Sequence, residues 1–115
     1  MTNPFDFVDE WLTVPDVAEK LDVPLGKVRR LIEEHQLFSV RFDGVQKIPA
    51  HLIETGEPLP SIRGTILVLL DAGFSPEAAA EWLYRVEESI GRRPIELLLE
   101  GRKSEVRRVA QSLAF

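Results

Sequence analysis

Hydrophobic residues recur every three to four positions in a short segment near the N-terminus, which is the period of an amphipathic helix. Its apolar face consists of Val14, Val17, Ala18 and Leu21. Thr13 followed by Asp16 resembles a capping box with Asp in place of the usual Glu. Pro15 is tolerated in a first turn, because its missing N–H would have no intrahelical partner there. We therefore predict a helix that starts after Thr13 and ends near Leu21.

A second helical pattern follows a break at residues 22–24. Pro24 has the backbone angle of a first helical residue, and the predicted helix runs from about Leu25 to His35. Its inward stripe consists of Val28, Leu31 and Ile32. Two short helices joined by a turn of about three residues form a helix-turn-helix.

The pattern then changes to alternation, which indicates β-strands. The alternating apolar residues of the first strand are Phe38, Val40 and Phe42. Asp43-Gly44 is a type I′ hairpin signal, after which residues 45–48 return as the second strand. Pro49 closes the hairpin and can start a short helix. The order helix, turn, helix, hairpin is that of a winged helix, with the wing at about residues 38–48.

The second half of the chain has helical patterns throughout. Residues 54–60 (ETGEPLP) form the only linker-like stretch, and we place a boundary there. The predicted helices are Ser61–Ala72, Pro76 to about Ile90, Pro94–Glu100 and Ser104–Leu113. Their predicted core contains Trp82, Leu83, Val86, Ile95, Leu98 and Leu99. Because Leu97, Leu98 and Leu99 cannot all face one small core, one of the three is available to a partner.

The predicted fold class is mainly α with a small β-hairpin wing: a winged helix-turn-helix followed by a C-terminal helical bundle. Residues 1–11 are expected to be an N-terminal tail whose Phe5, Phe7 and Trp11 can dock onto a core. Residues 12–55 are expected to form the winged helix-turn-helix domain. Residues 61–115 are expected to form the α-helical domain.

The charge is distributed unevenly along the chain. The 115 residues carry a net charge of −5, which at first argues against nucleic acid as a partner. Residues 25–48, however, contain five basic and three acidic residues and carry a net charge of +2. A locally basic surface on an acidic protein can bind DNA, although with little non-specific attraction.

The predicted recognition helix would place basic side chains in the major groove, where Arg and Lys reach guanine or phosphate. The candidate DNA-binding residues are Leu25, Gly26, Lys27, Arg29, Arg30, Arg41 and Lys47. The first five lie on the helix and the last two on the wing. Gly26 costs a helix up to about 1 kcal/mol relative to Ala, so close approach of a DNA backbone would explain it.

The same charges also have simpler interpretations. The arginines can form a solvated helix face, paired with Glu33 and Glu34 at a spacing of four residues. Outward charges such as Arg41 and Lys47 also protect sheet edges from unwanted pairing.

Other classes of function find little support in the sequence. The chain has no cysteine and only two histidines, which support no metal site. No phosphate-binding loop, nucleophile elbow or other catalytic motif is present, so we expect no enzyme activity and no cofactor. The N-terminus has no basic start before an apolar stretch, and the longest apolar run is Ile66–Leu70. We therefore expect a cytoplasmic protein without a membrane partner.

Residues 12–53, LTVPDVAEKLDVPLGKVRRLIEEHQLFSVRFDGVQKIPAHLI, resemble the winged helix-turn-helix of excisionase and MerR-type proteins. Pro24 stands where that family usually has a Ser cap, and Gln46 where it often has an aromatic residue. Residues 72–113, AGFSPEAAAEWLYRVEESIGRRPIELLLEGRKSEVRRVAQSL, are similar to the C-terminal domain of Xre/MbcA/ParS-type antitoxins.

The two-part arrangement as a whole resembles a family of small winged helix-turn-helix DNA-binding proteins of mycobacteria and other actinobacteria. The resemblance implies double-stranded DNA as a partner. Because a member of that family is a kinase substrate, it also implies a Ser/Thr kinase as a further partner. Thr2, in the predicted tail, is a conceivable site for such a modification.

Two functions of different classes remain. The first is a DNA-binding transcriptional regulator or architectural factor, whose wing and recognition helix contact the duplex. Five basic groups at its interface would give a salt slope of magnitude about 4 to 5 at most, so useful affinity calls for a homodimer or an accessory protein. The alternative is an antitoxin-like adaptor whose C-terminal helices bind a protein partner.

Overall fold

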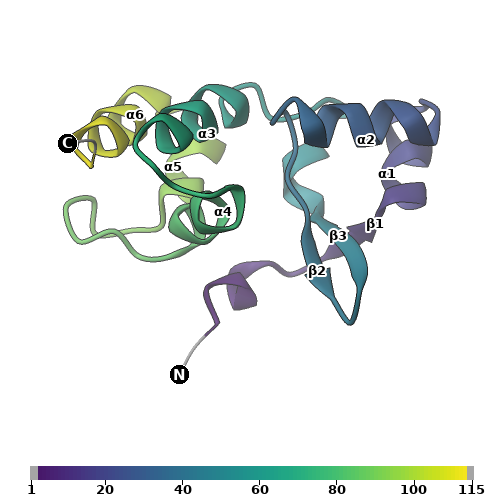
Figure 1. The fold of residues 1–115 in the computed structure, drawn as a ribbon, viewed down its shortest axis with the longest axis horizontal. Helices are drawn as coiled ribbons and strands as arrows, with labels where there is room; N and C mark the ends of the chain where they lie inside the picture. The colour runs from purple at the N-terminus through teal and green to yellow at the C-terminus, as the bar shows by residue number, and fades with distance from the viewer. Residues whose placement is uncertain (1–2, 114–115) are drawn as a thin grey trace. The chain divides into compact units, whose positions relative to one another are not determined.

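The computed structural model describes residues 3–113, and their contacts divide the chain into two units (Figure 1). The winged unit is Val8–Pro60. The helical unit starts at Ser61 and also includes the beginning of the chain, up to Phe7. Thr2, the conceivable modification site, lies outside the described residues.

The winged unit contains the two helices that the sequence predicts. Helix α1 is Val14–Leu21, and its capping box is confirmed. The Thr13 N–H donates to Asp16 Oδ2 at 3.1 Å, and the Asp16 N–H donates to Thr13 Oγ1 at 3.2 Å. Helix α2 is Leu25–Glu33, two residues shorter than predicted, because His35 adopts a left-handed backbone with φ 64°.

A three-stranded antiparallel sheet accompanies these helices, in the order β1-β3-β2. Strand β2 (Val40–Phe42) and strand β3 (Val45–Pro49) form the predicted wing. At the turn Asp43 and Gly44 have φ of 51° and 81°, as a type I′ turn requires. Strand β1 (Trp11–Thr13) was not predicted; it pairs with β3 and makes the hairpin part of a sheet.

The core of the winged unit joins these elements. Its fully buried side chains include Val17, Val28, Leu37, Ile48 and Leu52. They come from both helices, from β3, from the segment before the wing, and from the short 3-10 helix η2 (Ala50–Ile53). The wing is therefore fixed to the two helices by apolar packing, and two strands of three to five residues would not be stable without it.

The helical unit contains α3 (Ile62–Asp71), α4 (Pro76–Tyr84), α5 (Pro94–Leu99) and α6 (Lys103–Ser112). The predicted length of the second of these helices was wrong: α4 ends at Tyr84 instead of near Ile90. Arg85 is extended, and a small loop follows in which Glu87 pairs with Arg92. No helix within residues 3–113 is long and apolar enough to span a membrane.

The early end of α4 changes the predicted core. Val86 lies beyond the helix and is 58% exposed, so its assignment to the core was wrong. Leu99 is also wrong as a core residue, at 39% exposure, whereas Leu97 and Leu98 are buried. The expectation that the three consecutive leucines cannot all face the core is thus confirmed, and Leu99 is the one that points outward.

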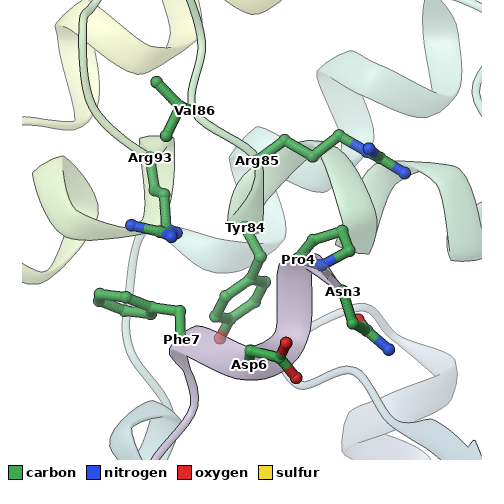
Figure 2. Close-up of a pocket in the computed structure, with 8 residues that line it drawn as sticks. All are labelled: Asn3, Pro4, Asp6, Phe7, Tyr84, Arg85, Val86 and Arg93. Atoms are coloured by element: carbon green, nitrogen blue, oxygen red, sulfur yellow. The ribbon is translucent and has the colours of Figure 1, made fainter. Parts of the chain in front are cut away.

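The helical unit is completed by residues 4–7, which we call the N-terminal strap. They form the 3-10 helix η1 (Pro4–Phe7). The rings of Phe5 and Phe7 lie 5.4 and 6.2 Å from the ring of Tyr84, which is fully buried. The Arg93 guanidinium lies 4.8 Å from the Phe7 ring centre, and Figure 2 shows the side chains of Phe7, Tyr84 and Arg93 next to one another. Part of the expected tail is therefore a packed element of the helical unit.

Candidate nucleic-acid interface

Helix α2 presents its charged side chains on one side because its other side is fixed in the core. Val28 and Leu31 are buried, while Lys27, Arg29 and Arg30 are exposed. The predicted recognition helix thus holds three cations on a rigid element, pointing to solvent. Rigid placement lowers the entropy that side chains and backbone lose when a partner binds.

The arginines of α2 form no ion pairs with the neighbouring carboxylates in the described part of the chain. Within residues 3–113 no ion pair joins Arg29 to Glu33, or Arg30 to Glu34. The simpler interpretation as a paired, solvated face requires such pairs. Their absence from the described part of the chain leaves the charges available for a polyanion.

The first turn of α2 is open to an approaching partner. Leu25 is 42% exposed, and Gly26 is exposed as well. A Cβ atom at Gly26 would have no heavy atom within 4 Å other than its own helix backbone and chain neighbours. Packing inside the chain therefore does not require a glycine at this position.

The two cations of the wing occupy different environments. Arg41 is exposed, and its Nη1 donates to the Gly44 carbonyl at 3.1 Å, which holds the side chain at the tip of the hairpin. Lys47 is half-buried in the central strand, between Thr13 of β1 and Val40 of β2. Of the two, Arg41 is the better placed for a phosphate.

Lys47 also contributes to the electrostatics of the first helix. The pKa of Asp16 lies below its usual value, first because the Thr13 backbone N–H donates to it and then because of the Thr13 hydroxyl. The positive charges of Lys47 and Lys20 add to this lowering. Lys47 thus has a role within the winged unit that its sequence position did not indicate.

The tip of the wing also carries apolar side chains that are not among the candidate DNA-binding residues from the sequence. Phe42 and Val45 are a cross-strand pair beside the turn, and they are 37% and 49% exposed. The Phe42 ring meets the Trp11 ring edge-on, with ring centres 4.9 Å apart. Apolar side chains at such a position can contact sugars or wedge between bases in a minor groove.

The two histidines belong to no metal-binding group in the described part of the chain. Within residues 3–113 no group of three or more His, Cys, Asp or Glu side chains is close enough to hold a metal ion. His51 is half-buried in η2, and burial is the main cause that lowers its pKa below 6.5.

Comparisons with known proteins agree with this architecture. Residues 6–53 match the family model of the winged helix-turn-helix domain of DNA-binding protein Rv2175c, and residues 59–114 match that of the Rv2175c C-terminal domain of unknown function. The chain is 30% identical to DNA-binding protein Rv2175c of Mycobacterium tuberculosis. The alignment is 115 residues long and covers 89% of this chain and 79% of that protein.

The solved structures add a match in three dimensions. The NMR structure of Rv2175c superimposes with a TM-score of 0.81 at 28% sequence identity, covering 92% of this chain and 82% of that one. Sequence and fold therefore agree over both units. The chain belongs to the Rv2175c family of winged helix-turn-helix DNA-binding proteins.

Proposed function

We propose that this protein binds double-stranded DNA with α2 in the major groove and the tip of the wing on the sugar-phosphate backbone. The observation that carries the proposal is the exposed face of α2, where Lys27, Arg29 and Arg30 are free of ion pairs within the described residues. A helix of this kind fits the major groove, which is about 12 Å wide.

The roles of the candidate residues differ in this proposal. Arg29 and Arg30 supply guanidinium groups that can donate two hydrogen bonds to a guanine or a phosphate. Lys27 acts as a point charge, and Arg41 contacts phosphate from the wing. Leu25 and Gly26 form the open first turn, where a base edge or backbone can approach closely.

The overall charge makes the proposed binding selective and weak. The winged unit contains six basic and ten acidic residues, a net charge of −4, so attraction is confined to the face of α2 and the wing tip. Proteins with little general attraction to DNA depend on specific contacts or on several copies acting together. We therefore propose a transcriptional regulator or architectural factor of the cytoplasm that acts as a homodimer or with an accessory protein, and not an enzyme.

The proposal is tested by charge reversal on α2. Fluorescence anisotropy with a labelled random-sequence duplex, measured across a salt series, compares the full-length protein with the variant R29E/R30E. We expect the variant to bind at least on the order of tenfold more weakly at low salt, with a salt slope reduced in magnitude by about 2.

A matched control changes the net charge equally at sites outside the proposed interface. K20E/R85E reverses two exposed cations, one on α1 and one just after α4. It should bind DNA much more tightly than R29E/R30E. Absence of binding by the unmodified protein at low salt, or equal losses in both variants, would contradict the proposed interface.

Three further expectations are not part of this interface and stay predictions. They are the likeness to excisionase and antitoxin domains, a Ser/Thr kinase as partner, and a protein partner for the helical unit. Among the described residues of that unit, Leu99 and Val86 are the exposed large hydrophobic ones. Light scattering with and without DNA measures how many copies of the protein associate, which tests the proposed homodimer.

A further inference from the structure

Helix α6 carries three cations that form no ion pair in the part of the chain that the structure describes. Lys103 and Arg108 are exposed and Arg107 is half-buried, and none of them forms an ion pair within residues 3–113. We call these three residues the α6 basic face. They are not among the candidates suggested by sequence motifs.

The nearby acidic residues are already paired with other arginines. Glu105 accepts two hydrogen bonds of 2.9 Å from Arg102, one from Nε and one from Nη2. Glu100 is bound by Arg92 and also contacts Arg102 at 3.4 Å. Hydrogen bonds from Arg102 are the main cause that lowers the pKa of Glu105, and the charge of Arg108 adds to the lowering. Both carboxylates therefore form their ion pairs outside the α6 basic face, and Glu105 offsets Arg108 in part.

Helix geometry places the three cations together. Val106 and Ala110 are fully buried and define the inner side of α6. With 3.6 residues per turn, Lys103 and Arg107 lie one turn apart, on the flank beside the inner side, and Arg108 is about 100° further round. The three cations therefore share one flank of α6.

Packing against α3 holds Arg107 in place. The guanidinium lies against Gly64, where an added Cβ would overlap it, and Nε is buried with no hydrogen-bond partner in the described part of the chain. Gly64 thus leaves room for an arginine that is positioned by packing instead of by a carboxylate. A cation fixed in this way loses little entropy when it meets an anion.

The local charge exceeds that of the recognition region. Residues 102–108 contain four basic residues and one acidic residue, a net charge of +3, against +2 for residues 25–48. The helical unit from Ser61 onward has equal numbers of basic and acidic residues, so this concentration reflects segregation of charge along the chain. A group of cations without ion pairs suits the closely spaced phosphates of DNA, which carry one charge per about 1.7 Å of duplex axis.

We propose that the α6 basic face is a second DNA contact, which binds the phosphate backbone without regard to sequence. This inference rests on the proposed function and assigns a role to the helical unit. Phosphate contacts supply affinity and orientation, whereas the recognition helix supplies sequence preference.

The salt dependence of binding tests this inference. The four exposed cations of the winged interface alone give a slope of magnitude about 4, and three more phosphate contacts raise it to about 6. In full-length K103Q/R108Q we expect the magnitude to fall by about 2, with at least a fivefold loss of affinity for a labelled random-sequence duplex at low salt. This variant leaves Arg107 and its packing intact.

Matched variants make the outcomes distinct. K20Q/R85Q removes two exposed cations elsewhere and should leave the slope unchanged. R107Q should lower the slope by about 1, and its thermal unfolding shows whether the fold persists. An unchanged slope in K103Q/R108Q, with binding still weakened by R29E/R30E, overturns the inference and leaves the proposed function standing. Failure of the unmodified protein to bind DNA overturns the proposed function itself.

Discussion

Gly26 lowers the stability of helix α2, and nothing in the packing of the protein requires a glycine there. It lies in the first turn of α2, its φ is not in the left-handed region, and no side chain approaches the space beside it. We expect G26A to stabilise the protein by up to about 1 kcal/mol, because alanine favours a helix more than glycine does. We also expect weaker DNA binding, because the added methyl group would keep the DNA backbone or base edge further away.

The two measurements for G26A are urea unfolding and anisotropy with duplex DNA. Gly56 offers a comparison, because its φ of 86° makes substitution by alanine unfavourable although the space around it is equally open. Increased stability with unchanged DNA affinity would show that close approach of DNA does not explain Gly26.

His51 makes stability depend on pH. Burial lowers its pKa in the folded protein, against the opposing effects of Glu54 and Asp9, so the folded state prefers the neutral imidazole. As pH falls below about 6.5 the unfolded chain takes up a proton first, and stability is lost until the lower folded-state pKa has been passed. We expect the free energy of unfolding to decrease from about pH 7.5 to about pH 5.5.

The contribution of His51 is isolated by the variant H51Q. Glutamine does not titrate, so its free energy of unfolding should change less between the two pH values. Urea denaturation at both values gives the comparison, and an equal pH dependence in the two proteins would assign the effect to other groups.

Individual residues were predictable where their interactions are local. The bonds between Thr13 and Asp16 and the turn at Asp43-Gly44 involve residues at most three positions apart, so sequence spacing was sufficient. The environment of Lys47 depends on β1, which lies more than 30 residues earlier in the chain. Spacing carries no information about such a neighbour.

At the scale of elements, the misplaced boundaries have physical causes. Strand β1 has only three residues, too few to show alternation, and it is defined by its pairing with β3. Helix α4 was extended too far because the residues after Tyr84 keep a helical spacing of apolar positions. The loop there offers other hydrogen bonds: the Glu87 N–H donates to the Arg92 carbonyl at 3.0 Å, and the Gly91 N–H donates to the Glu87 carbonyl at 2.7 Å.

The N-terminal strap is the element whose contribution to stability is most easily measured. The Phe7 ring packs against the Tyr84 ring, and the Arg93 guanidinium lies over the Phe7 ring. We expect F7A to destabilise the protein by about 1 to 3 kcal/mol, less than for a fully buried ring because Phe7 remains partly exposed. V86A, at an exposed position beside the strap, should change stability by less than about 0.5 kcal/mol.

Urea unfolding compares these two variants. A loss in F7A no larger than that in V86A would mean that the strap adds nothing to the stability of the helical unit.

At the scale of the whole molecule, the distribution of charge matters more than its sum. The winged unit accounts for −4 of the net charge of −5, yet it contains the proposed recognition helix. The order of elements was enough to predict a winged helix-turn-helix and the residues of α2. The α6 basic face was not predicted, because it matches no motif and is recognised only when the partners of Glu100 and Glu105 are known.

The strap has a consequence for how the protein is made. The winged unit is continuous in sequence, so it can fold during synthesis as soon as Pro60 has left the ribosome. The helical unit combines residues on both sides of the winged unit in the sequence, so Phe5 and Phe7 must wait for Tyr84 to emerge. A fragment that begins at the linker would contain α3 to α6 but leave the Tyr84 ring without its aromatic cover. We therefore expect that the C-terminal half alone does not fold as it does in the whole chain, because it lacks the N-terminal strap.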